Sequence, residues 1–167
     1  MGGGKRAQQP GDGDERDILT GWLAFHRDAL AAKCAGLTDD QLAERSVDPS
    51  RLSLLGLVRH LAEMERAYGV WALGPEAELV WVWGSYENDA EDDIDCDGTM
   101  VAESMRAWEA EMRKTDDALR SHPTLDEVCA GNGRSVRWNL AKLVGEYARH
   151  NGHADLIRER IDGQTGE

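Results

Sequence analysis

Four long segments carry apolar residues at helical spacing, and this pattern constrains the fold more than any other feature of the chain. The segments cover residues 15–33, 54–73, 99–120 and 135–161. Apolar side chains recur there at every third or fourth position, which indicates amphipathic helices rather than strands. Gly36 and Gly163 are placed to end helices, and Ser53 to begin one. A short extra helix to about Arg45 is predicted where Thr38-Asp-Asp-Gln matches a capping box. Four long helices with mostly short joints predict an all-α four-helix bundle.

The connection between the second and third long helices is much longer than the others. Its first part, residues 79–83, is the apolar run LVWVW, which has no partner strand, so we expect an extended crossover that packs its tryptophans on the bundle. Its second part, residues 87–97, carries seven carboxylates in eleven residues, which is typical of a solvated loop. Residues 93–98 open like an EF-hand calcium loop, but Ser104 stands where that loop needs a bidentate Glu. A solvated linker is therefore the favoured interpretation.

An excess of acidic side chains argues against two classes of partner. The 32 Asp and Glu residues outnumber the 19 Lys and Arg residues and give a net charge of −13. Such a surface repels nucleic-acid phosphates and anionic lipid headgroups, so we expect neither nucleic acid nor a membrane as a partner. No apolar run approaches the roughly 20 residues of a membrane span, and residues 1–13 do not resemble a signal peptide. We expect a cytoplasmic protein with a disordered segment at 1–13, one domain at 14–163 and a tail at 164–167.

The cysteines and two of the histidines show no arrangement that suggests chemistry. The three cysteines are Cys34, Cys96 and Cys129. They form no Cys-x-x-Cys pair, so neither a redox motif nor a thiolate zinc site is indicated, and free thiols in a reducing cytoplasm are the simplest interpretation. His26 and His122 lack partners in the sequence pattern, and we expect both on the surface.

The last helical segment carries the most informative polar residues. Glu146, His150 and His153 recur at i, i+4 and i+7, which places a carboxylate and two imidazoles on one stripe of the helix. These groups are usual ligands of zinc and related divalent metals. His60 flanks the apolar stripe of the second helix in the same way. A metal between these two helices is the leading hypothesis, and the alternative is a carboxylate–histidine hydrogen-bond network, or plain boundary residues, without a metal.

Two long stretches of the chain resemble the mini-circle-protein branch of the DinB/YfiT-like superfamily. They are residues 53–66 (SLLGLVRHLAEMER) and 146–163 (EYARHNGHADLIRERIDG). Residues 33–42 and 135–140 fit the same branch, so the resemblance extends from about residue 17 to residue 163. It implies a DinB-like four-helix bundle with up-down-down-up order, usually cytoplasmic and often a homodimer, with a divalent metal between the second and fourth helices.

The resemblance also implies a ligand set. The superfamily usually supplies one His from the second helix and a His-x-x-x-His from the fourth. His60 matches the first position and His150 the last, while Glu146 occupies the remaining one, as in the mycothiol-dependent isomerases of the superfamily. His60, Glu146 and His150 are thus the expected metal ligands, with zinc or nickel as the metal. His153 is expected to be a fourth ligand or a catalytic proton-transfer group.

The expected ligand set also suggests a function, because it leaves a position on the metal free. Three protein ligands leave at least one metal position free, which is typical of catalytic sites. Characterised members of the superfamily include thiol-dependent transferases and isomerases that use mycothiol or bacillithiol. We therefore predict a metal-dependent transferase that joins a low-molecular-weight thiol, such as mycothiol, to an electrophilic small molecule. The alternative is a non-enzymatic metal or small-molecule binding protein of stress-response or mobile-element origin.

Overall fold

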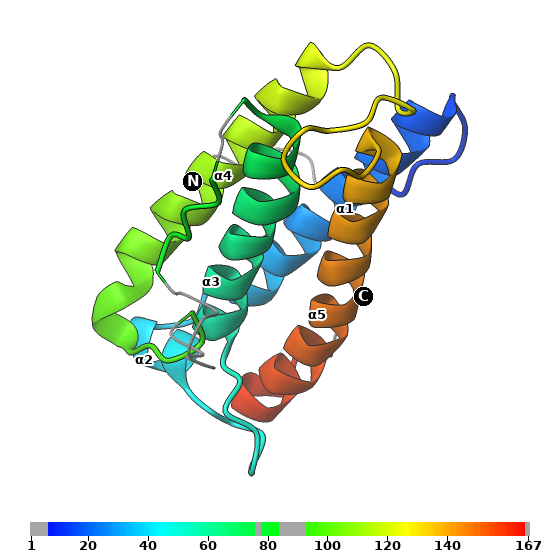
Figure 1. The fold of residues 1–167 in the computed structure, drawn as a ribbon. Coiled ribbons are helices and arrows are strands. Elements are labelled where there is room, and N and C mark those ends of the chain that lie inside the picture. Colours follow the sequence, from blue (N-terminus) through cyan, green and yellow to red (C-terminus); the bar gives the residue numbers. More distant parts are fainter. Residues whose placement is uncertain (1–6, 76–77, 84–92, 166–167) are drawn as a thin grey trace.

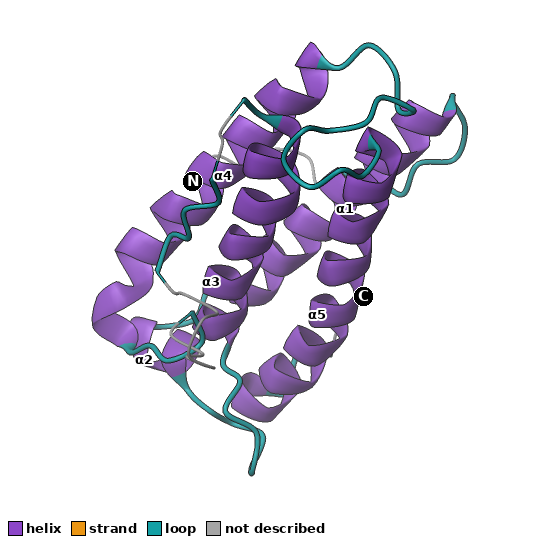
Figure 2. Ribbon diagram, in the orientation of Figure 1, coloured by secondary structure: helices purple, strands orange, loops and turns teal. Residues whose placement is uncertain are grey.

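Helices make up the regular structure of the chain in the computed structural model, which describes residues 7–75, 78–83 and 93–165. They are α1 (Glu15–Cys34), α2 (Asp39–Ala43), α3 (Leu54–Met64), η1 (Glu65–Trp71), η3 (Gly98–Met100), α4 (Val101–Ser121) and α5 (Val136–Asp162). Within the described residues there is no strand, and a single isolated β-bridge joins Val128 to Ser135 (Figure 2). No helix in these parts of the chain is long and apolar enough to cross a membrane. The all-α prediction is confirmed.

The four long helices form a bundle in which two consecutive helices run parallel. Figure 1 shows α1 and α5 running in one direction and α3 and α4 in the other. Helix α5 packs along α1 and α3, while α4 packs along α3 and η1. Because α3 and α4 are parallel, the chain returns along the bundle between them, and residues 78–83 lie on this return (Figure 1). The predicted up-down-down-up bundle with a long crossover is confirmed.

The helix ends follow local signals in the sequence. The Thr38 side chain and Gln41 form the predicted capping box at the start of α2. Ser53 and Ser135 accept hydrogen bonds from backbone N–H groups in the first turns of α3 and α5. Gly163 ends α5 with a φ of 77°, a left-handed conformation that glycine adopts without steric cost. The ends of the helices are therefore set largely by residues next to them in the chain.

The second long helix changes geometry part-way along its length. It is π-helical from Glu65 to Trp71 and returns to α-helix for two residues, an irregularity that the sequence did not predict. An α-helix turns by about 100° per residue, so a four-residue step overshoots a full turn by about 40°. The wider π turn, with i→i+5 hydrogen bonds, holds more residues, so the same step falls short of a full turn. The π segment thus keeps Tyr68 on the same face as His60 and Met64, and all three line one pocket.

A hydrogen-bonded polar cluster lies among the apolar side chains of the core. Arg27 donates to both carboxylate oxygens of Glu65, each at 2.8 Å. The Tyr147 hydroxyl donates to Glu65 Oε1 at 2.8 Å and accepts from Trp108 Nε1 at 2.7 Å. Glu65 is fully buried, so these charge-assisted bonds offset the cost of removing its carboxylate from water. Helices α1, α4 and α5 and segment η1 each contribute one residue to this core cluster.

Candidate metal centre

Three potential metal ligands converge where α3 faces α5. His60 Nε2 lies 3.9 Å from Glu146 Oε2, and His150 Nε2 lies 3.5 Å from the same oxygen. One ligand atom from each of the three residues can be chosen so that all lie within 4.8 Å of one another. The rings of His60 and His150 meet edge to face, with centroids 4.7 Å apart. The structure therefore brings together three of the four residues singled out in the sequence.

His60 is the position at which the otherwise buried helix α3 is exposed to solvent. Every other residue from Leu54 to Glu65 is buried, because neighbours pack around most of this stretch, whereas the His60 side chain keeps 21% of its surface exposed. On α5, Glu146 and His150 are one turn apart and face His60. Tyr147, next to Glu146, points in the opposite direction into the core. The site thus lies at the boundary between the core and solvent.

The electrostatic environment leaves His150 and Glu146, two of the three candidate ligands, in forms that bind cations. Burial, together with the neighbouring charges of His60 and His153, lowers the pKa of His150 to about 4, so its imidazole is neutral near pH 7. Burial acts to raise the pKa of Glu146, but the hydrogen bond and charge of Lys142 outweigh it, and the pKa falls below its ordinary value. Lys142 pairs with Glu146 Oε1, which leaves Oε2 facing the histidines.

The fourth candidate, His153, lies outside this cluster. Its Nδ1 is 3.2 Å from Nδ1 of His150, so it contacts the side of the His150 ring opposite the nitrogen that faces Glu146. Among the described residues, the three-residue group of ligand atoms does not include it.

A carboxylate that the sequence analysis assigned to a solvated loop also reaches the site. Asp93 is 7% exposed, and its Oδ2 lies 2.8 Å from Nδ1 of His60. Burial acts to raise the pKa of Asp93, but the hydrogen bonds from His60 and from backbone N–H groups lower it overall. The solvated interpretation is wrong for this residue. Positions 87–92 of the predicted loop lie outside the described residues.

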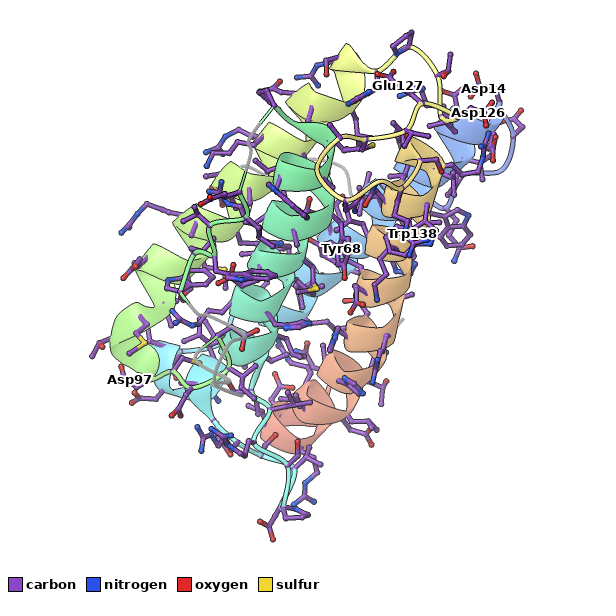
Figure 3. The ribbon with its side chains drawn as sticks, viewed as in Figure 1. Asp14, Tyr68, Asp97, Asp126, Glu127 and Trp138 are labelled. Atoms are coloured by element: carbon purple, nitrogen blue, oxygen red, sulfur yellow. The ribbon has the colours of Figure 1, made fainter. Side chains whose placement is uncertain are left out.

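A pocket of about 520 Å³ opens at the three candidate ligands. Besides His60, Glu146 and His150, it is lined by Met64, Tyr68, Trp81 and Arg149. This combination of apolar walls with a few polar groups, at this volume, is typical of small-molecule sites. Figure 3 shows Tyr68 of η1 beside Trp138 of α5, and their ring centroids are 6.0 Å apart.

The crossover contributes Trp81 to the pocket because Glu63 holds its backbone. The buried Glu63 carboxylate accepts hydrogen bonds from the N–H groups of Val82 at 2.8 Å and Trp83 at 2.7 Å. Trp83 in turn covers the guanidinium of Arg59, whose Cζ lies 4.2 Å from the ring centroid. The prediction that this run packs its tryptophans on the bundle is confirmed, since both rings lie against the core.

The two histidines expected on the surface are both partly buried. His26 stacks on Trp22, with ring centroids 5.6 Å apart, and its carbonyl accepts a hydrogen bond from Asn151. His122 Nε2 lies 2.8 Å from the carbonyl oxygen of Leu73. The expectation was wrong because Asn151 and Leu73 are both distant in the sequence from the histidine that they contact.

A comparison with protein families identifies the family. The sequence model of the family described as "MST: Mycothiol-S-transferase" matches residues 18–163. The chain belongs to the mycothiol S-transferase family. This family lies within the DinB-like superfamily, so the resemblance seen in the sequence is confirmed at that level, while the mini-circle branch stays a prediction. No curated protein and no solved structure matches the chain.

Proposed function

We propose that the protein is a metal-dependent S-transferase that joins mycothiol, or a closely related thiol, to electrophilic small molecules. Membership of the mycothiol S-transferase family supports the thiol and the transfer reaction. The observation that carries the metal part of the proposal is the convergence of His60, Glu146 and His150 at one end of a pocket.

The donor set fits a zinc or nickel ion. Imidazole nitrogen and carboxylate oxygen bind Zn²⁺ at about 2.0–2.2 Å, so two ligand atoms on one ion are roughly 3–4 Å apart. The distances of 3.5 and 3.9 Å from Glu146 Oε2 to the two imidazole nitrogens fall in this range. The low pKa of His150 also favours binding, because a ligand must be deprotonated before it binds a metal.

The pocket residues support a thiol-transfer reaction. A divalent cation held by the three ligands would supply the positive charge that lowers the pKa of a bound thiol. Met64, Tyr68 and Trp81 form apolar walls that exclude water and hold the electrophile, while Arg149 presents a cation to an anionic group of either substrate. In the reaction the thiol loses its proton and its sulfur bonds to the electrophilic carbon. The displaced electron pair departs with a leaving group or, in an addition, takes up a proton.

The contact of His153 supports proton transfer over metal ligation. Its ring faces Nδ1 of His150, away from Glu146 Oε2, so a proton can pass between the two imidazoles. Glu146→Gln should therefore weaken metal retention more than His153→Ala does. If His153→Ala instead empties the site while Glu146→Gln leaves it full, the ligand set is His150 and His153.

The first test measures the metal. Purified protein should hold about one divalent ion per chain by native mass spectrometry, and His60→Ala and His150→Ala should each lower the bound fraction sharply. His122→Ala is the matched control, because its imidazole binds the carbonyl of Leu73 outside the pocket. Equal metal content in all three variants would place the site elsewhere.

The second test measures the thiol. In cobalt-substituted protein, mycothiol should produce a sulfur-to-metal charge-transfer band, with a midpoint pH well below the pKa of about 8.5 of a free thiol. The metal-loaded protein should then accelerate conjugation of mycothiol to a test electrophile, and the metal-free protein should not. If the metal binds but no thiol from a broad panel changes the spectrum, the protein is a metal-binding or small-molecule binding protein instead.

A further inference from the structure

Asp93 holds the nitrogen of His60 that faces away from the proposed metal. Its Oδ2 lies 2.8 Å from His60 Nδ1, while Nε2 of the same ring points to Glu146. An ionised carboxylate can only accept hydrogen bonds, so Nδ1 carries the hydrogen, and in the neutral imidazole this leaves the lone pair on Nε2. Asp93 belongs to none of the helices, and it comes from the end of the crossover rather than from the helix that carries His60.

Several independent contacts fix Asp93 in this position. Its Oδ1 accepts a hydrogen bond from the backbone N–H of Ile94 at 3.0 Å, and its carbonyl oxygen accepts one from Nε of Arg59 at 2.8 Å. Arg59 precedes His60 in α3 and also donates to Ser104 Oγ of α4 at 3.3 Å. The carboxylate and the imidazole are therefore both anchored to the same stretch of α3.

Helix α3 also provides the room for this approach. A Cβ added at Gly56 would lie 3.1 Å from the carbonyl oxygen and 3.3 Å from Cα of Ile94, closer than most real contacts. Gly56 is one turn before His60, so the absence of a side chain there lets the backbone after Asp93 lie directly on the helix. A surface ion pair formed by chance would need no such close fit.

We propose that Asp93 is a positioning residue of the metal centre, which holds His60 in the orientation and tautomer that present Nε2 to the ion. This inference rests on the proposed function. Residues that bind the outer nitrogen of a metal-ligating histidine commonly change metal affinity by about 10–100-fold when they are removed. Asp93 also adds a second carboxylate next to the site, and its negative charge favours a cation there.

The experiment compares zinc affinity in a set of variants by competition with a chromophoric chelator. Asp93→Ala should weaken binding by about 10–100-fold, and Asp93→Asn by less, because its amide oxygen can still accept from Nδ1. Gly56→Ala should weaken binding through a different change, by moving residues 93–94 off α3. Asp95→Ala is the matched control, since Asp95 lies in the same segment but pairs with Arg45 in solvent.

A second readout needs no metal. Long-range ¹H–¹⁵N spectra of the metal-free protein should show His60 protonated at Nδ1 in the wild type and a loss of this preference in Asp93→Ala. Unchanged tautomer and unchanged affinity in Asp93→Ala would overturn the inference while leaving the proposed function intact. Failure of the wild-type protein to bind any divalent ion would overturn both.

Discussion

Substitution of Gly69 in the π-helical segment by alanine tests which of two opposing effects on the unfolding free energy is larger. Alanine is favoured over glycine in a helix interior by about 1 kcal/mol. A Cβ at Gly69 would, however, lie 2.0 Å from Oγ1, 2.6 Å from Cγ2 and 2.7 Å from Cβ of Thr115 on α4. Overpacking of this kind costs about 1–3 kcal/mol or more. Moving Thr115 would also break its hydrogen bond to the carbonyl of Glu65, which contributes about 1 kcal/mol. The clash should win, and Gly69→Ala should destabilise the protein by roughly 1–3 kcal/mol.

Urea unfolding followed by circular dichroism measures this change. Thr115→Ala removes the two nearest atoms, so the double variant Gly69→Ala/Thr115→Ala should lose less stability than the two single variants added together. Gly145→Ala is the matched control, because nothing lies within 4 Å of a Cβ built there in α5, and it should stabilise the protein by about 0.5–1 kcal/mol. The reasoning is refuted if Gly69→Ala stabilises the protein as Gly145→Ala does.

Three further outcomes are expected. Tyr147→Phe should lower the unfolding free energy by about 1–3 kcal/mol in urea titrations, because Trp108 Nε1 loses its buried acceptor and Glu65 loses a donor. The metal-free protein should lose stability as the pH falls from 6.5 to about 4, since the unfolded chain protonates His150 at the higher value and the folded chain only at the lower one. In thermal scans, the melting temperature of His150→Gln should depend less on pH over this range than that of the wild type. Chelation should lower the melting temperature of the metal-loaded protein, and restored zinc should reverse the loss.

The fold could be predicted because its determinants are local. Helical periodicity, the capping box at Thr38 and the terminating Gly163 each involve residues within a few positions of one another, and all are found in the structure. The π-helical segment could not be predicted in this way. Within it, Gly69 faces Thr115 of α4, and such a contact between segments distant in the chain leaves no mark in the local sequence pattern.

The candidate site shows the same division between local and distant determinants. The spacing of Glu146 and His150 on one helix, together with the family resemblance, was enough to select these residues and His60. Asp93 was missed because a run of carboxylates is usually solvated. Its burial depends on Arg59 and Gly56, which lie far from it in the chain and which no pattern in the acidic run itself reveals.

The core cluster of Arg27, Glu65, Trp108 and Tyr147 has a consequence for which substitutions this scaffold tolerates. It joins the helices from the inside, whereas Glu146, the immediate neighbour of Tyr147, faces the pocket. Substitutions at Tyr68 and Trp81 therefore leave the hydrogen bonds of this cluster in place, whereas the third apolar wall residue, Met64, belongs to the buried core. A library confined to Tyr68 and Trp81, which are both half-buried, should keep a high fraction of folded members.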